Sequence, residues 1–79
     1  MSEANVGDRV VDARGRVIGR VDAVYADYLL VRTRGLLPVD LYVPRSEVNR
    51  IDERRLQVAL TSAQAYEAWH RPLRRAPHD

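Results

Sequence analysis

The chain has 79 residues, which suits one domain, and a domain of this size buries only a little over about 60% of its unfolded surface. It contains no cysteine, which excludes disulfides and thiolate metal sites and leaves a partner subunit as the simplest way to bury more surface. All 13 basic residues are arginine, set against 11 acids. This near balance argues against a strongly basic nucleic-acid-binding body.

The first third of the chain predicts a hairpin. Residues 6–12 begin with β-branched residues and predict a strand, and Gly15 can take a positive φ in a turn at 13–16. Residues 17–25 predict a second strand by their alternation, in which one face carries Val17, Gly19, Val21, Ala23 and Tyr25 and the other carries Ile18, Arg20, Asp22 and Val24. Gly19 inside this run predicts a bend or bulge.

The middle of the chain predicts two more strands. A two-residue turn at 26–27 leads into a strand at 28–33. Pro38 places residues 34–38 in a loop, because proline cannot donate to a central ladder, and residues 39–43 alternate as a fourth strand. Residues 44–48 predict one short helical turn with Pro44 at its first position, and residues 49–52 a brief extended piece.

The last part of the chain predicts a strand at 54–60 and then a change of period to a helix at 62–70. Thr61 and Gln64 form a capping box at its start, and Pro72 ends it. Because a helix this short is unstable alone in water, it must dock on the rest of the fold, and we expect it to cap an open end of the barrel. Three residues at helical spacing are expected to dock: Ala65, Tyr66 and Trp69.

Short strands separated by Gly and Pro turns in so short a chain favour a small barrel over a sandwich. We therefore predict a mainly β fold, a small β-barrel of five to six strands with one short C-terminal helix. The expected organisation is a flexible N-terminus at 1–5, a folded domain at 6–70 and a disordered basic tail at 71–79.

The order of the motifs resembles that of PRC-barrel domains. Residues 7–12 (Gly-Asp-Arg-Val-Val-Asp) and 15–22 (Gly-Arg-Val-Ile-Gly-Arg-Val-Asp) are similar to the opening hairpin of that family. The segment 41–44 (Leu-Tyr-Val-Pro), then Val48, Ile51 and the strand up to Leu60, resembles a later family pattern, and the closing helix resembles a free-standing bacterial branch. The resemblance implies a PRC-type barrel with a binding or assembly role, without catalytic residues or a cofactor.

The candidate partner-binding residues lie on the third and fourth strands. If Leu29 and Val31 fill the core, then Tyr28, Leu30 and Arg32 face outward, together with Asp40 and Tyr42 of the next strand. Tyrosine and arginine are enriched where proteins bind proteins. In the alternative arrangement, Leu30 and Tyr42 are core residues and Leu29 and Val31 lie outside. The third strand is apolar on both sides, so either the helix or a second subunit must cover one side. This observation favours a homodimer that also binds a further protein partner.

The alternative function is that of an RNA- or ribosome-associated factor. Tyr28, Tyr42 and Arg32 on a small barrel could stack on bases and clamp them, and the basic tail contains Arg71, Arg74 and Arg75. The interspersed acids of the body favour the protein-binding role over this one.

No pattern predicts an enzyme or a metal site. His70 and His78 are eight residues apart, a spacing that fits no zinc motif, and Ser46 and Ser62 lack a nearby base in the sequence. A lone Trp69 is expected to be a packing residue rather than an exposed anchor. The sequence shows no signal peptide and no membrane-spanning run, so we expect a cytoplasmic protein without a membrane partner.

Overall fold

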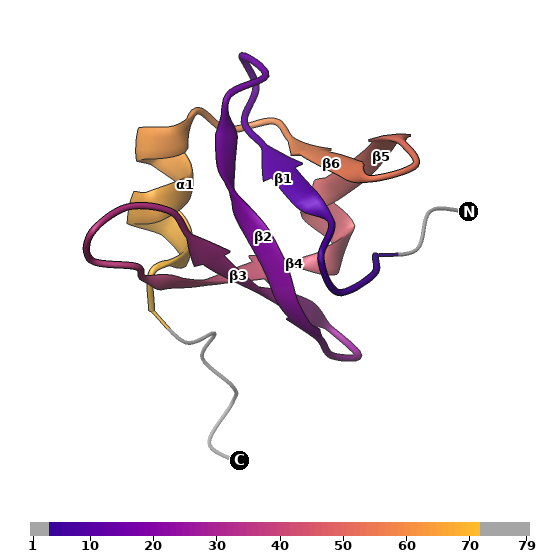
Figure 1. Cartoon of the computed structure of the whole chain (residues 1–79), viewed down its shortest axis with the longest axis horizontal. Coiled ribbons are helices and arrows are strands. Elements are labelled where there is room, and N and C mark those ends of the chain that lie inside the picture. The colour runs from indigo at the N-terminus through magenta and orange to yellow at the C-terminus, as the bar shows by residue number, and fades with distance from the viewer. Residues whose placement is uncertain (1–3, 72–79) are drawn as a thin grey trace.

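The computed structural model describes residues 4–71, which form six strands, one short 3-10 helix and one α-helix (Figure 1). In chain order the elements are β1 (Arg9–Val11), β2 (Val17–Val24), β3 (Tyr28–Thr33), β4 (Asp40–Pro44), η1 (Arg45–Glu47), β5 (Val48–Asp52), β6 (Arg55–Val58) and α1 (Ser62–Trp69). The mainly β fold with one short C-terminal helix is confirmed. Of the tail predicted at 71–79, residues 72–79 lie outside the described residues.

All six strands belong to one mixed sheet in the order β4-β3-β2-β1-β6-β5. Neighbouring strands are antiparallel except β1 and β6, which run parallel. The sheet curves into a half-barrel whose edge strands, β4 and β5, are joined in sequence by η1. Residues close to the N-terminus thus lie beside β6, a pairing between distant parts of the sequence (Figure 1).

Two bulges in β2 bend the sheet, which confirms the irregularity predicted there. Val10 pairs with Gly19 and Val11 with Val17, so Ile18 is the extra residue. A second bulge leaves out Asp22. The strict alternation predicted for 17–25 is wrong, because each extra residue reverses the side on which its neighbours lie. Ile18 is consequently buried, and the structure moves three further residues off their expected faces: Ala23, Val24 and Tyr25.

Gly19 brings two strands into close contact. A Cβ atom at this position would lie 2.3 Å from the carbonyl oxygen of Arg32 on β3. Any side chain would therefore push β2 away from its neighbour, so glycine is required by the approach of the backbones.

The concave side of the sheet holds the core, and α1 covers it (Figure 1). The inward side chains of β3 and β4 are fully buried: Leu29, Val31, Leu41 and Val43. From α1, Ala65 and Trp69 join this cluster, and only 7% of Trp69 is exposed, which confirms its packing role. Tyr66 was expected to dock as well, and this is wrong. It lies off the face shared by positions 65 and 69 and instead stacks on His70.

Asp12 fastens the first hairpin to the start of α1. Its buried carboxylate accepts hydrogen bonds from the Ser62 hydroxyl at 2.7 Å and the Ser62 amide at 3.1 Å. The amides of Arg14 and Arg16 donate to its other oxygen at 2.8 and 2.9 Å. The Ser62 hydroxyl, together with these amides, lowers the pKa of Asp12 to about 2 despite its burial. The predicted capping box of Thr61 and Gln64 is also formed, so the helix start is held from two sides.

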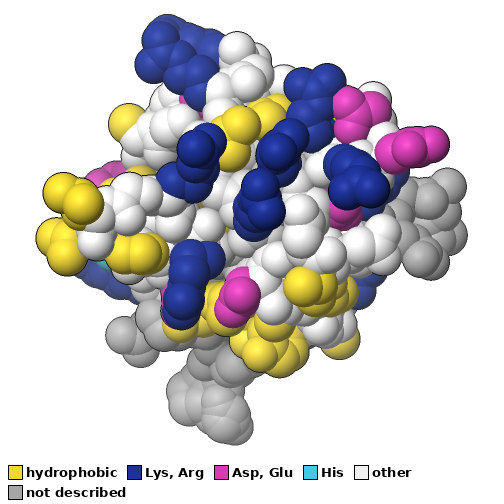
Figure 2. All heavy atoms as spheres, in the orientation of Figure 1, with side chains coloured by type: hydrophobic (Ala, Val, Ile, Leu, Met, Phe, Trp, Pro, Cys, Tyr) yellow, Lys and Arg dark blue, Asp and Glu magenta, His cyan; other side chains and the backbone are white. Residues whose placement is uncertain are grey.

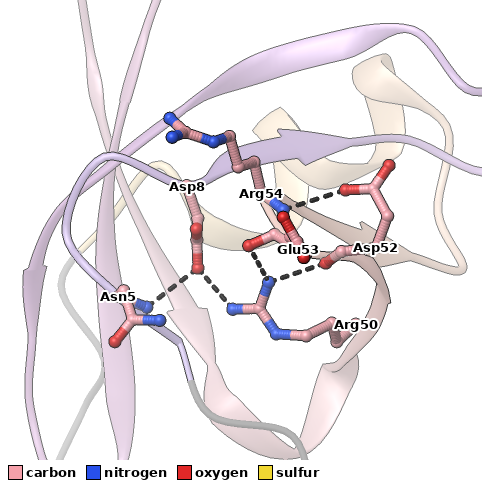
Figure 3. A network of polar contacts seen from close by, with 6 residues as sticks. All are labelled: Asn5, Asp8, Arg50, Asp52, Glu53 and Arg54. Atoms are coloured by element: carbon pink, nitrogen blue, oxygen red, sulfur yellow. Dashed lines mark hydrogen bonds and ion pairs between the residues drawn. The ribbon is translucent and has the colours of Figure 1, made fainter.

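A second polar network ties the N-terminal segment to the β5–β6 turn (Figure 3). The guanidinium of Arg50 lies 2.5 Å from the buried carboxylate of Asp8 and also donates to the carbonyl oxygens of Asp52 and Glu53. Asp8 further accepts from the amide of Asn5 at 2.9 Å. Ala4, the residue before Asn5, packs against the hydrophobic core. Residues 4 and 5, which precede the expected start of the domain at residue 6, thus make contacts with the rest of the fold.

Candidate binding face on the outside of the sheet

Burial along β3 and β4 decides which side of these strands faces outward. Leu29 and Val31 are buried, whereas Tyr28 and Leu30 are partly exposed and Arg32 is exposed. On β4, Tyr42 is likewise partly exposed between buried neighbours. The predicted outward face is therefore present, and the alternative that placed Leu30 and Tyr42 in the core is wrong.

The outward side of β3 and β4 carries a group of apolar and aromatic side chains that we call the aromatic patch, formed by Tyr25, Tyr28, Leu30 and Tyr42. The rings of Tyr25 and Tyr28 stack with centroids 4.7 Å apart, and the ring of Tyr42 lies tilted at 5.8 Å from that of Tyr28. Leu30 is the cross-strand neighbour of Tyr42. The three rings thus form a continuous surface, of which Tyr25 is 46% exposed.

Tyr25 was not among the predicted site residues, although the predicted turn at 26–27 could have indicated it. The two-residue turn at 26–27 places residues 25 and 28 opposite each other, and the amide of Tyr25 donates to the carbonyl of Tyr28 at 2.9 Å. The bulge at Asp22 then turns Tyr25 to the outer side. Arg45 of η1 holds this turn by donating to the Tyr25 carbonyl at 3.1 Å.

Arg32, the fourth predicted site residue, lies outside the patch at the far end of β3. Its Nε atom is 3.3 Å from the Asp40 carboxylate, and the Arg32 side chain is mostly exposed while that of Asp40 is partly exposed. Surface pairs of this kind contribute about 0–1 kcal/mol to stability. Arg32 therefore lies beside the patch, and its ion pair contributes little to the stability of the fold.

The strand pairing brings four arginines into one line, which we call the arginine row: Arg32, Arg20, Arg9 and Arg55. Arg32 pairs with Arg20 across β3 and β2, and Arg20 pairs with Arg9 across β2 and β1. Arg9 in turn pairs with Arg55 on β6. An acid closes each end of the line, because Asp40 is the cross-strand partner of Arg32 and Asp52 that of Arg55.

Figure 2 shows arginine side chains gathered over the face formed by β1 and β2. A hollow of about 90 Å³ lies between Arg9, Arg20, Arg54 and the bare backbone of Gly7. A second, wider hollow of about 400 Å³ is lined in part by Arg20, Arg32 and Arg34, with Asp22 as its one acid. This face is open and basic, in contrast to the balanced charge of the whole chain.

Two of the polar residues considered for chemistry, Ser62 and His70, have structural partners. Ser62 donates its hydroxyl to Asp12, and the Nδ1 atom of His70 lies 2.7 Å from the Tyr66 carbonyl at the end of α1. Ser46 lies exposed in η1, and His78 lies outside the described residues. Within residues 4–71 there is no group of three or more side chains that could hold a metal ion. No helix in this part of the chain is long and apolar enough to cross a membrane.

No family model and no curated protein matches the chain. The resemblance to PRC-barrel domains therefore rests on the motifs at 7–22 and 41–60. In the structure the first of these segments forms the bulged β1–β2 hairpin, and the second runs from β4 through η1 and β5 to the end of β6.

Proposed function

We propose that the protein is a non-catalytic, PRC-barrel-like assembly module that forms a homodimer through the aromatic patch. The observation that carries this proposal is the cluster of three tyrosine rings and Leu30 on the outer side of β3 and β4. Tyrosine is enriched in the centres of protein interfaces, where a large rigid ring loses little entropy on binding.

The β3–β4 hairpin offers further apolar surface at its tip. Leu36 and Leu37 in its loop are 99% and 85% exposed. Two adjacent leucines left in water, on the hairpin that carries most of the aromatic patch, mark this region as a contact site rather than ordinary surface. A partner that covered both the outer side and the tip would approach the roughly 800 Å² per subunit that stable interfaces bury.

A second copy of the chain fits this surface by charge and by size. A two-fold interface uses the same area on both subunits, so it needs opposite charges within that area. Arg32 and Asp40 supply one of each beside the patch. The small size of the domain adds a reason, because a chain of this length gains stability by burying surface against a partner.

The contacts of the two buried carboxylates, Asp8 and Asp12, support a role without catalysis. Asp8 is engaged by Arg50, and Asp12 by Ser62 and two amides. Each of these groups joins distant parts of the chain. A catalytic carboxylate needs a free oxygen facing a substrate.

The proposal is tested by sedimentation equilibrium with two matched variants. The wild type is expected to show twice the chain mass of 9.0 kDa at micromolar concentration. Tyr25→Ser should weaken the dimer about tenfold or more, as expected for a ring at an interface centre. Tyr66→Ser is the control, because Tyr66 has almost the same exposure, 45% against 46%, but lies on α1.

A mass of 9.0 kDa at every concentration up to the solubility limit would refute the homodimer. An equal loss in the Tyr25→Ser and Tyr66→Ser variants would refute the assignment of the interface to the aromatic patch. Thermal unfolding of both variants checks that each is folded.

A further inference from the structure

The arginine row opposes the stability of the sheet that carries it. Like charges directly opposite each other on neighbouring strands are destabilising, and the row contains three such neighbouring pairs. Aspartates balance only its two ends, where Arg32 lies 3.3 Å from Asp40 and Arg55 lies 2.7 Å from Asp52. Such an arrangement is retained at a loss of stability, which points to a use in binding.

The centre of the row is open to an anion. Within residues 4–71, no ion pair joins Arg9 or Arg20 to a carboxylate. Both line the 90 Å³ hollow with Arg54, and Gly7 contributes no side chain to fill it. This volume equals roughly three water molecules at about 30 Å³ each. An anion placed there would be approached by three guanidinium groups.

We propose that the arginine row binds the phosphate backbone of a nucleic-acid strand. Neighbouring strands lie about 4.8 Å apart, so four arginines in register span about 14 Å in a line. A line of equally spaced cations matches a polymer that carries one charge on every unit. The guanidinium fork is also the side chain best suited to phosphate, because it donates two parallel hydrogen bonds.

A nucleic-acid backbone fits the row better than an acidic protein does. The centres of protein interfaces are depleted of charged residues and rely on apolar contacts. The central hollow is instead lined by three arginines and a glycine, with no apolar side chain. Contacts of arginine with phosphate are the usual way in which a protein holds a nucleic acid independently of its base sequence.

Three of the four arginines of this site lie away from the proposed dimer interface, and only Arg32 borders both. Arg20, Arg9 and Arg55 lie on β2, β1 and β6, while the aromatic patch occupies β3, β4 and the turn before β3. A dimer formed through the β3–β4 hairpin would therefore leave these three arginines accessible. Binding at the row and association through the patch can fail independently.

The test uses fluorescence anisotropy of a labelled, mixed-sequence RNA strand of about 12 nucleotides, within the usual site size of small barrels. The full-length protein should bind this RNA with an affinity that falls as salt rises, by about 0.7 in the log–log slope for each phosphate contact. The double variant Arg9→Gln/Arg20→Gln should lower that slope by about 1.4 and weaken binding about 25-fold at 0.1 M salt. Its thermal midpoint should equal or exceed that of the wild type.

The matched control is Arg14→Gln/Arg16→Gln, which removes the same charge from the β1–β2 turn. It should bind the RNA with nearly wild-type affinity, because charges more than about 10 Å away are screened at this salt concentration. The row is refuted as a phosphate site if the wild type shows no salt-sensitive binding, or if the control loses as much affinity as the row variant. Displacement of the RNA by equimolar polyglutamate would overturn the proposal in favour of an acidic protein partner. The Tyr25→Ser variant should bind the RNA like the wild type, which separates this test from that of the dimer.

Discussion

The aromatic patch and the arginine row share the outer face of one sheet, but their side chains relate to the fold in opposite ways. In the patch, rings contact one another at 4.7 and 5.8 Å and are partly withdrawn from water. In the row, cations stand opposite cations on neighbouring strands. The first arrangement stabilises the monomer and the second destabilises it.

This contrast separates two kinds of binding surface. A substitution in the patch should reduce stability and association together, because the same ring contacts serve both. A substitution in the row should reduce binding while leaving stability equal or improved. Comparing unfolding with binding for each variant therefore tests whether the two regions differ as proposed.

The largest loss of stability is expected from a substitution in the core, on which both regions depend. Trp69 fills the core beneath the sheet, so Trp69→Ala should lower the free energy of unfolding by about 3–5 kcal/mol. For so small a domain, this loss would unfold much of the protein and remove dimer and RNA binding together. Urea denaturation measures it, with Tyr66→Ala as the exposed aromatic control. A midpoint unchanged in Trp69→Ala would contradict the core assignment.

Acid should loosen the side of the molecule that carries the row. The folded-state pKa of Asp12 is about 2, below its ordinary value of 3.8, so its ionised form stabilises the fold above about pH 4. That contribution is lost as the pH falls from about 4 towards 2. Because Asp12 joins the β1–β2 turn to α1, Asp12→Asn should flatten the dependence of the urea midpoint on pH over this range. If the urea midpoint of the variant depended on pH as that of the wild type does, carboxylates other than Asp12 would be responsible for the loss of stability in acid.

An intermediate effect is expected in the patch. Tyr28 contacts rings on both sides, and each aromatic pair contributes about 0.5–1.5 kcal/mol. Tyr28→Ala should therefore lower the free energy of unfolding by about 1–3 kcal/mol and also weaken the dimer, as followed by urea denaturation and sedimentation. A variant that lost association with full stability would show that the rings do not support the monomer.

The smallest change in stability is expected in the row, and with the opposite sign. Arg20 has an arginine opposite it on each side. Arg20→Gln should leave the free energy of unfolding unchanged or raise it by about 0.2–1 kcal/mol, while weakening RNA binding about fivefold at 0.1 M salt. Arg14→Gln in the β1–β2 turn, which removes the same charge away from the row, is the control for both measurements. A clear loss of stability in Arg20→Gln would remove the contrast between row and patch.

Local signals were enough to predict much of the fold. The bounds of β3 agree with the expected strand at 28–33, and the capping box of Thr61 and Gln64 begins the helix as expected. These features depend on neighbours within a few residues, where turn chemistry and periodicity act directly. Alternation put Tyr28, Leu30 and Arg32 on one side of their strand, but it left open which side faces outward, and only the burial of the intervening residues decided this.

The failures arose where a single residue changes the phase of a strand. The bulges at Ile18 and Asp22 reversed the expected faces around them, and Tyr25 joined the aromatic patch as a result. Tyr66 was expected to dock although only positions 65 and 69 share the buried side of α1. Gly19 indicated an irregularity in this strand, but the positions of the two extra residues depend on the curvature of the whole sheet.

The sequence by itself therefore determined the strands, the turns and the residues that share one side of β3 or of β4, because each is governed by short-range conformational preferences. Which of the two sides faces outward was decided by the tertiary structure. Only the tertiary structure decided that Arg9 lies between Arg20 and Arg55, since this requires a parallel pairing of β1 with the distant β6. The register of strands far apart in the chain is set by how their inner side chains fill a common core. In this protein that inner packing places the four arginines in line on the outer face.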